Sequence, residues 1–126
     1  MIRIVIPVQA PKAENSPIAT HFGIAPYFAV VEVNVNTDIT NITLEPNNSE
    51  PAGGTEDLEG TLLELKPDVI IANFMGPSIA DTFRSVGIKI LQAHGATIKE
   101  NVANYKQDSL HNLVANCPSN NSATEQ

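Results

Sequence analysis

One of the three histidines stands where the sequence could place a ligand. His21 follows a proline-containing loop and precedes Phe22 and Gly23, shortly before a run of residues typical of a β-strand. A histidine in such a place either hydrogen-bonds the backbone of a turn or projects as a ligand for a metal or an anion. The residues by themselves leave both interpretations open.

The remaining histidines and the single cysteine give weaker signals. His94 precedes Gly95 and is either a turn residue or a ligand, whereas His111 is expected to be solvated and Cys117 to be a surface thiol. No His-x-His or His-x3-His pair occurs, which argues against a closed structural zinc site. One cysteine also excludes an internal disulfide and any metal site made of cysteines from one chain.

A glycine pair and a set of acidic residues mark a second loop. Gly53 and Gly54 form either a turn before a helix or a place where the backbone approaches a bound group closely. The acidic residues either face solvent or favour a hard cation, which leaves a hydrolase with a carboxylate-bound cation as a third hypothesis. They are Glu45, Glu50, Glu56 and Asp57.

Composition and missing motifs exclude several classes of function. The formal net charge is −7, from seven basic and fourteen acidic residues, and no two basic residues are adjacent. Nucleic acids and anionic membranes are therefore poor partners. The chain has no GxxxxGK[ST] motif for a nucleotide and no recognisable Ser-His-Asp or Cys-His arrangement, so we expect no enzyme activity. Without a long apolar run or a signal-peptide cleavage site, a cytoplasmic location is expected.

Hydrophobic periodicity predicts five strands and three helices in the order βββαβαβα. The expected strands cover residues 2–8, 27–35, 39–44, 68–72 and 88–91. The first expected helix carries Leu58, Leu62 and Leu65 on one face, with Thr55 as its N-cap, and the second opens at residues 76–78. The third begins with a capping box at residues 97–100.

This order predicts a five-stranded mixed sheet with helices on both faces. Right-handed crossovers and one hairpin give the strand order 3-2-1-4-5, with strand 2 antiparallel. Loops 9–26, 45–54, 73–76 and 93–97 then meet at one edge of the sheet, where open α/β sheets bind ligands. The order is similar to the ribonuclease H-like fold, but the first strand lacks the carboxylates that a two-metal nuclease needs.

Four segments together resemble one known family. The runs SPIATHFGIAPYFAVVEV, AGG before a helix, DVIIANFMGP, and GIKIL followed by GATIKENVANY resemble the dinitrogenase iron–molybdenum cofactor biosynthesis family. The family includes nitrogenase accessory proteins. The resemblance extends from Met1 to about Leu110. It implies a domain at residues 1–110, and residues 111–126 are expected to form a polar, disordered tail.

The resemblance also implies a binding site. The histidine of the family's H-F-G motif, a proposed cluster ligand, falls on His21, and the glycines of the binding edge fall on Gly53, Gly54 and Gly76. The predicted site residues, with His21 as the metal ligand, are His21, Phe22, Gly23, Gly53, Gly54, Asn73, Gly76 and His94. Asn73 and His94 are not typical family positions.

The function implied is non-catalytic binding, carriage or storage of a metal–sulfur cluster or its precursor. The cluster would contain iron or molybdenum, and its partners would be cluster-donor and cluster-acceptor proteins. Imidazole suits such metals, and a cluster that already carries sulfides needs few protein ligands. The alternative is a domain that senses a small anion or binds a protein partner with no metal role.

Overall fold

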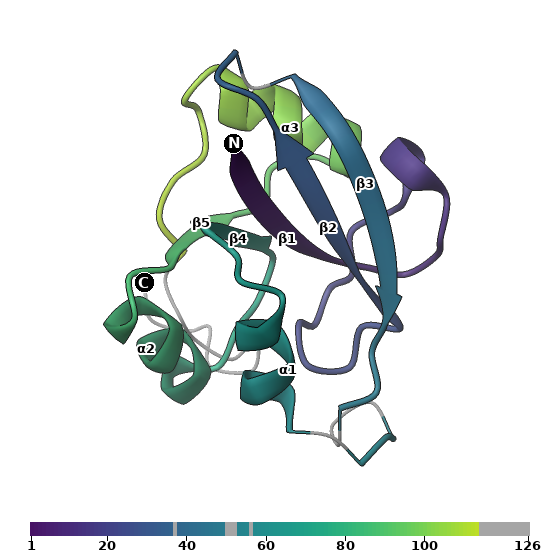
Figure 1. The fold of residues 1–126 in the computed structure, drawn as a ribbon, viewed down its shortest axis with the longest axis vertical. Coiled ribbons are helices and arrows are strands. Elements are labelled where there is room, and N and C mark those ends of the chain that lie inside the picture. Colours follow the sequence, from purple (N-terminus) through teal and green to yellow (C-terminus); the bar gives the residue numbers. More distant parts are fainter. Residues whose placement is uncertain (37, 50–52, 56, 114–126) are drawn as a thin grey trace, which may run out of the picture.

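The strands form one mixed sheet in the predicted order, β3-β2-β1-β4-β5 (Figure 1). In this computed structural model, which describes residues 1–36, 38–49, 53–55 and 57–113, β1 pairs antiparallel with β2 and parallel with β4. The β2–β3 pair is antiparallel and the β4–β5 pair is parallel. The strands are β1 (Ile2–Val8), β2 (Tyr27–Val33), β3 (Ile39–Pro46), β4 (Val69–Ala72) and β5 (Lys89–Gln92). The predicted α/β fold, of the ribonuclease H-like kind in its strand order, is confirmed.

Three α-helices cover the two faces of the sheet (Figure 1). They are α1 (Leu58–Glu64), α2 (Pro77–Ser85) and α3 (Ile98–Lys106). Leu62 of α1 and Phe83 of α2 belong to one buried apolar cluster, and Ile98 and Val102 of α3 belong to another. Because successive strand residues point to opposite faces, the apolar runs of β1 and β4 supply both clusters.

The described element ends differ from the predicted ones for identifiable reasons. The N-cap of α1 is Asp57 and not Thr55, because the Asp57 carboxylate accepts a hydrogen bond from the Gly60 backbone N–H at 2.8 Å. The sequence also gave no sign of the short 3-10 helix η1 (Ala13–Asn15). Ser16, which is fully buried, closes η1 by accepting from the Lys12 N–H and donating to the Ala13 carbonyl.

The chain after α3 returns along the free edge of β5. The Gln92 N–H donates to the His111 carbonyl at 2.7 Å, and the Leu113 N–H donates to the Ile90 carbonyl at 3.1 Å. Leu113 is 3% exposed and belongs to the cluster that α1 and α2 cover. The packed part of the chain thus includes residues beyond the predicted boundary at Leu110, while the rest of the predicted tail, residues 114–126, lies outside the described residues.

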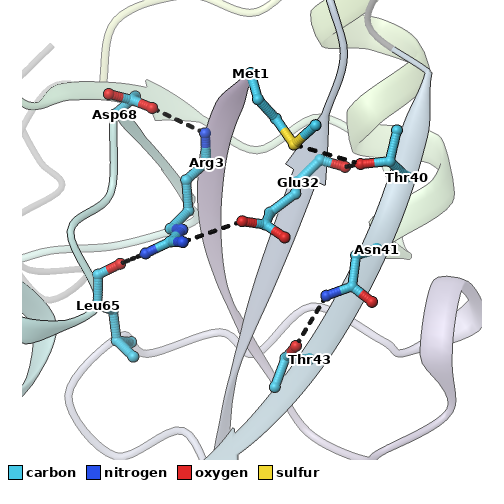
Figure 2. A network of polar contacts seen from close by, with 8 residues as sticks. All are labelled: Met1, Arg3, Glu32, Thr40, Asn41, Thr43, Leu65 and Asp68. Carbon is cyan, nitrogen blue, oxygen red and sulfur yellow. Dashed lines mark hydrogen bonds and ion pairs between the residues drawn. The ribbon is translucent and has the colours of Figure 1, made fainter.

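Arg3 joins four elements at the amino end of β1 (Figure 2). Its guanidinium donates to the Leu65 carbonyl at the end of α1 at 2.8 Å and to the Glu32 carboxylate on β2 at 3.0 Å. Its backbone N–H donates to Asp68, just before β4, at 2.9 Å. This network lies at the opposite end of β1 from the loops predicted to bind a ligand.

No helix in the described part of the chain is long and apolar enough to cross a membrane.

Candidate functional site

The loop between β1 and β2 crosses the carboxyl edge of the sheet. It first turns back on β1, where the Ala19 N–H donates to the Pro7 carbonyl at 2.9 Å. It then pairs with the start of α3, because the Ile18 N–H donates to the Ala96 carbonyl and the Ile98 N–H to the Ser16 carbonyl. These bonds hold residues 16–19 against the end of β1 and against the start of α3, which is far away in the sequence.

His21 lies against the end of β4. It forms an isolated parallel bridge with Phe74, and the centroids of the two rings are 6.1 Å apart. The His21 side chain is exposed, and no residue that the structure describes forms a hydrogen bond with its imidazole. A turn histidine that satisfied the backbone would have such a bond. Within the described residues the His21 imidazole therefore has no backbone bond, and its role as a ligand is a proposal.

The two residues after His21 anchor it. The Phe22 side chain is 3% exposed and packs at 5.3 Å from Phe28 and 6.2 Å from Phe83, measured between ring centroids. Phe22 therefore holds the loop on the hydrophobic core. The Gly23 carbonyl accepts a hydrogen bond from the Asn47 amide at 3.0 Å, which ties the loop to the chain just after β3.

The three glycines predicted at the binding edge have different surroundings. A Cβ added at Gly76 or at Gly53 would meet nothing within 4 Å among the described atoms, although Gly53 has a positive φ of 93°. A Cβ at Gly54 would lie 2.1 Å from the Asn48 carbonyl oxygen. Gly54 is thus required by close packing of its own loop, while Gly76 leaves the backbone beside His21 and Phe74 open.

The helix N-termini at this edge differ in how their N–H groups are used. The N-cap side chains of α1 and α3 accept hydrogen bonds from Gly60 and Glu100, and the first N–H of α3 donates to Ser16. The N-cap of α2 is Gly76, which makes no side-chain cap. Among the described helices, α2 therefore begins without a side-chain cap, two residues from Phe74.

Asn73 and His94, the two predicted residues outside the family pattern, lie in different settings. The Asn73 amide donates to the Ala19 carbonyl at 3.3 Å, so Asn73 supports the loop that carries His21. His94 lines a separate hollow together with His111, and His21 is not among the described residues that line it. The structure therefore groups His21 with the Asn73–Gly76 turn and separates it from His94.

Two buried asparagines that organise these loops were not predicted. Asn47, 9% exposed, donates to the Gly23 and Ala25 carbonyls, the latter at 2.7 Å. Asn101, fully buried, accepts from the His94 N–H at 2.8 Å and donates to the Gly95 and Thr97 carbonyls. The burial of Asn101 could have been predicted from its position in the sequence, because it stands three residues after Ile98 and so lies on the apolar face of α3.

No group of three or more histidine, cysteine, aspartate or glutamate side chains in the described ranges could hold a metal ion.

Comparison with known proteins assigns the chain to a family. Residues 3–108 match the family described as dinitrogenase iron-molybdenum cofactor, and because this match covers most of the sequence, the chain belongs to that family. The predicted family is confirmed. No curated protein sequence matches the chain.

Solved structures show the same fold at low sequence identity. The apo form of the orange protein from Desulfovibrio gigas is 18% identical with a TM-score of 0.71, over 91% of this chain and 95% of that one. A protein from Methanocaldococcus jannaschii, provisionally named a dinitrogenase, is 16% identical with a TM-score of 0.72, over 91% and 97%. A Thermotoga protein, provisionally named a NifB protein, is 22% identical with a TM-score of 0.69, over 89% and 93%.

Proposed function

We propose that this protein is a non-catalytic carrier that binds an iron- or molybdenum-containing metal–sulfur cluster, or its precursor, at the carboxyl edge of the sheet. The observation that carries the proposal is the exposed His21 imidazole, unbonded by any described residue and held beside the Phe74–Gly76 turn. Membership of the cofactor family supports the class of cargo.

The chemistry of the edge fits a cargo that must be released. An imidazole nitrogen can bind iron or another transition metal of the cluster. The sulfides of an anionic cluster can accept hydrogen bonds from the N–H groups at the start of α2, and Gly76 lets the cluster approach the backbone. With one protein ligand the cluster is held weakly enough to pass from a donor protein to an acceptor protein.

The test is reconstitution without oxygen. The full chain is incubated with iron(II) and sulfide, or with thiomolybdate, and desalted, and retained metal and visible absorption are measured. We expect His21→Ala to lose most of the retained metal, while the control variant Asn41→Ala, at an exposed position on β3, keeps it. Equal retention by His21→Ala and the parent protein would reject His21 as a ligand.

The second candidate function is recognition of a small anion with no metal involved. The uncapped N-terminus of α2 favours it, because that feature needs no metal to bind a phosphate or a carboxylate. Ligand at 100 times its dissociation constant adds about 2.7 kcal/mol to the free energy of unfolding. A thermal shift with phosphorylated metabolites, and none with metals or thiomolybdate, would favour this function over cluster carriage.

A further inference from the structure

Two of the three histidines line one hollow away from His21. The hollow has a volume of about 280 Å³ and lies between the end of β5 and the segment that returns after α3. The described residues that line it are Gln92, Ala93, His94, Asn104, Ser109 and His111. Two histidines that are 17 positions apart in the sequence thus line the same hollow.

Hydrogen bonds to the backbone hold both histidines in place. The His94 N–H donates to the buried Asn101 amide oxygen, and the His94 carbonyl accepts from the Asn104 amide. The His111 carbonyl accepts from the Gln92 N–H at 2.7 Å. The backbone on both sides of the hollow is therefore fixed before any ligand arrives, which reduces the entropy lost on binding.

The two imidazoles themselves are free to bind. Both side chains are exposed, and neither forms a hydrogen bond with a residue that the structure describes. The Asn104 amide nitrogen is used by His94, and the Ser109 hydroxyl donates to the Asn104 carbonyl at 2.9 Å. Asn104 and Ser109 thus add neutral oxygen atoms to the residues that line the hollow.

The lining of the hollow selects the class of ligand. None of its described residues is a lysine, arginine, aspartate or glutamate, which disfavours both an anion and a hard cation such as Ca²⁺ or Mg²⁺. Pockets for organic ligands are generally lined mainly by apolar groups, whereas most of the residues here are polar. Neutral imidazoles with neutral oxygen atoms suit divalent transition metals, and a net charge of −7 attracts cations.

We propose that His94 and His111 form a second site, independent of His21, that binds a divalent transition-metal ion such as Zn²⁺. Two imidazoles leave the remaining positions of a tetrahedral ion to water or to the oxygens of Asn104 and Ser109. A site with two protein ligands binds more weakly than a closed structural zinc site and exchanges its metal with solution. The protein would then bind a single metal ion at one site and a cluster at another.

The test uses zinc alone and replaces each histidine in turn. Calorimetric titrations with Zn²⁺ are made on the metal-free full chain carrying Cys117→Ser, so that a thiolate does not contribute to binding. We expect one bound Zn²⁺, weakened at least about tenfold, or 1.4 kcal/mol, by His94→Gln or by His111→Gln. The matched variant His21→Gln should bind Zn²⁺ as the parent does.

A second readout does not depend on any histidine variant. In NMR spectra of the imidazole nitrogens, Zn²⁺ should shift the signals of His94 and His111 and leave those of His21 in place. Undiminished binding by both single variants, equal weakening by all three, or no Zn²⁺ binding by the parent would overturn the proposal. Loss of cluster retention in His21→Ala alone bears on the carrier function and leaves this site unaffected.

Discussion

Two glycines at the same edge of the sheet have opposite requirements for space. Gly54 leaves no room for a Cβ, which would meet the Asn48 backbone 2.1 Å away, while Gly76 faces open space. Since the φ of Gly76 is −64°, an alanine there adopts the same backbone without strain. Replacing each glycine with alanine therefore tests whether Gly54 is needed for folding and whether Gly76 is needed only to leave space at the surface.

We expect Gly54→Ala to lower the free energy of unfolding by about 1–3 kcal/mol, the usual cost of forcing extra atoms into a packed place. Gly76→Ala should cost less than about 1 kcal/mol, the scale of a helix N-cap effect. Urea denaturation of both variants measures the difference. A Gly76→Ala variant as destabilised as Gly54→Ala would contradict the open surroundings of Gly76.

The same Gly76→Ala variant tests the proposed site, because its new methyl group would stand between the backbone and a cluster. We expect it to retain the parent's stability within about 1 kcal/mol while losing more than half of the metal retained after anaerobic reconstitution. Metal analysis after desalting gives the result. Retention equal to the parent's would show that the cargo does not approach this turn.

At the scale of an element, the start of α3 depends on one buried side chain. Asn101 bonds the backbone of His94, Gly95 and Thr97, with its amide nitrogen 2.8 Å from the Thr97 carbonyl. Gly95 fits this turn through its φ of 130°, and a Cβ there would lie 2.8 Å from the Glu100 Cβ. The turn between β5 and α3 is therefore fixed by Asn101 from inside the molecule.

Asn101→Ala should destabilise the protein by about 2–3 kcal/mol, because it leaves buried backbone groups without partners. Hydrogen exchange of the amides at residues 94–97 should speed up more than that of β1. The exposed Asn41→Ala, on β3, is the matched control and should change stability by less than about 0.5 kcal/mol. Unchanged exchange at residues 94–97 in Asn101→Ala would contradict this role.

A second prediction for α3 concerns alkaline pH. Burial raises the pKa of Tyr105 above its ordinary value of 10.0, and the nearby charges of Asp68 and Asp108 raise it further. The unfolded chain therefore loses the tyrosine proton first, so the contribution of Tyr105 to stability is complete below pH 10 and is lost as the pH rises through the raised pKa. Tyr105→Phe should remove this loss.

The measurement is the difference in free energy of unfolding between Tyr105→Phe and the parent, followed from about pH 8 to pH 11. The difference should stay constant to about pH 9 and then move in favour of the variant. Asp108→Asn should reduce the alkaline loss in the parent background. A constant difference across the whole range would contradict the raised pKa.

The elements themselves were predictable from sequence because their signals are local. Apolar alternation defined β1, and the capping box at Thr97 and Glu100 marked the start of α3, where Thr97 does cap Glu100. The start of α1 was predicted wrongly because Thr55 and Asp57 are both good N-cap residues. Which of them is used depends on how the loop before them packs, and that information is not local.

The arrangement of the predicted site residues was harder to predict from the sequence, because it depends on contacts that are not local. Convergence of the loops followed from strand order, so the position of His21 at the sheet edge could be expected. The grouping of His94 with His111, and the burial of Phe22 beneath His21, depend on contacts between segments far apart in the sequence. Hydrophobic periodicity carries no information on such contacts.

At the scale of the whole molecule, hydrogen bonds between segments far apart in the sequence join the elements at both ends of β1. Arg3 joins β1 to β2, to the end of α1 and to the segment before β4 at one end (Figure 2). At the other, the loop that carries His21 is tied to α3. Of the two edge strands, β3 and β5, the second is covered by the segment that ends at Leu113.

This arrangement predicts that the folded domain includes Leu113. Leu113 packs in the cluster that α1 and α2 cover, and its carbonyl accepts a hydrogen bond from Arg84 of α2. Removing a buried leucine side chain costs about 2–5 kcal/mol, so Leu113→Ala should lower the free energy of unfolding by that amount. The neighbouring Asn112→Ala, at an exposed position, is the matched control and should cost less than about 0.5 kcal/mol.

Truncated chains measure how much the segment from His111 to Leu113 contributes to stability. Two shortened chains, one that ends after Leu113 and one that ends after Leu110, are compared by urea denaturation. The one that ends after Leu110 should unfold at a markedly lower urea concentration, because it loses both the Leu113 side chain and the backbone bonds that cover β5. Equal midpoints for the two truncated chains would place the end of the folded domain at Leu110, and the contacts of Leu113 would then contribute nothing to stability.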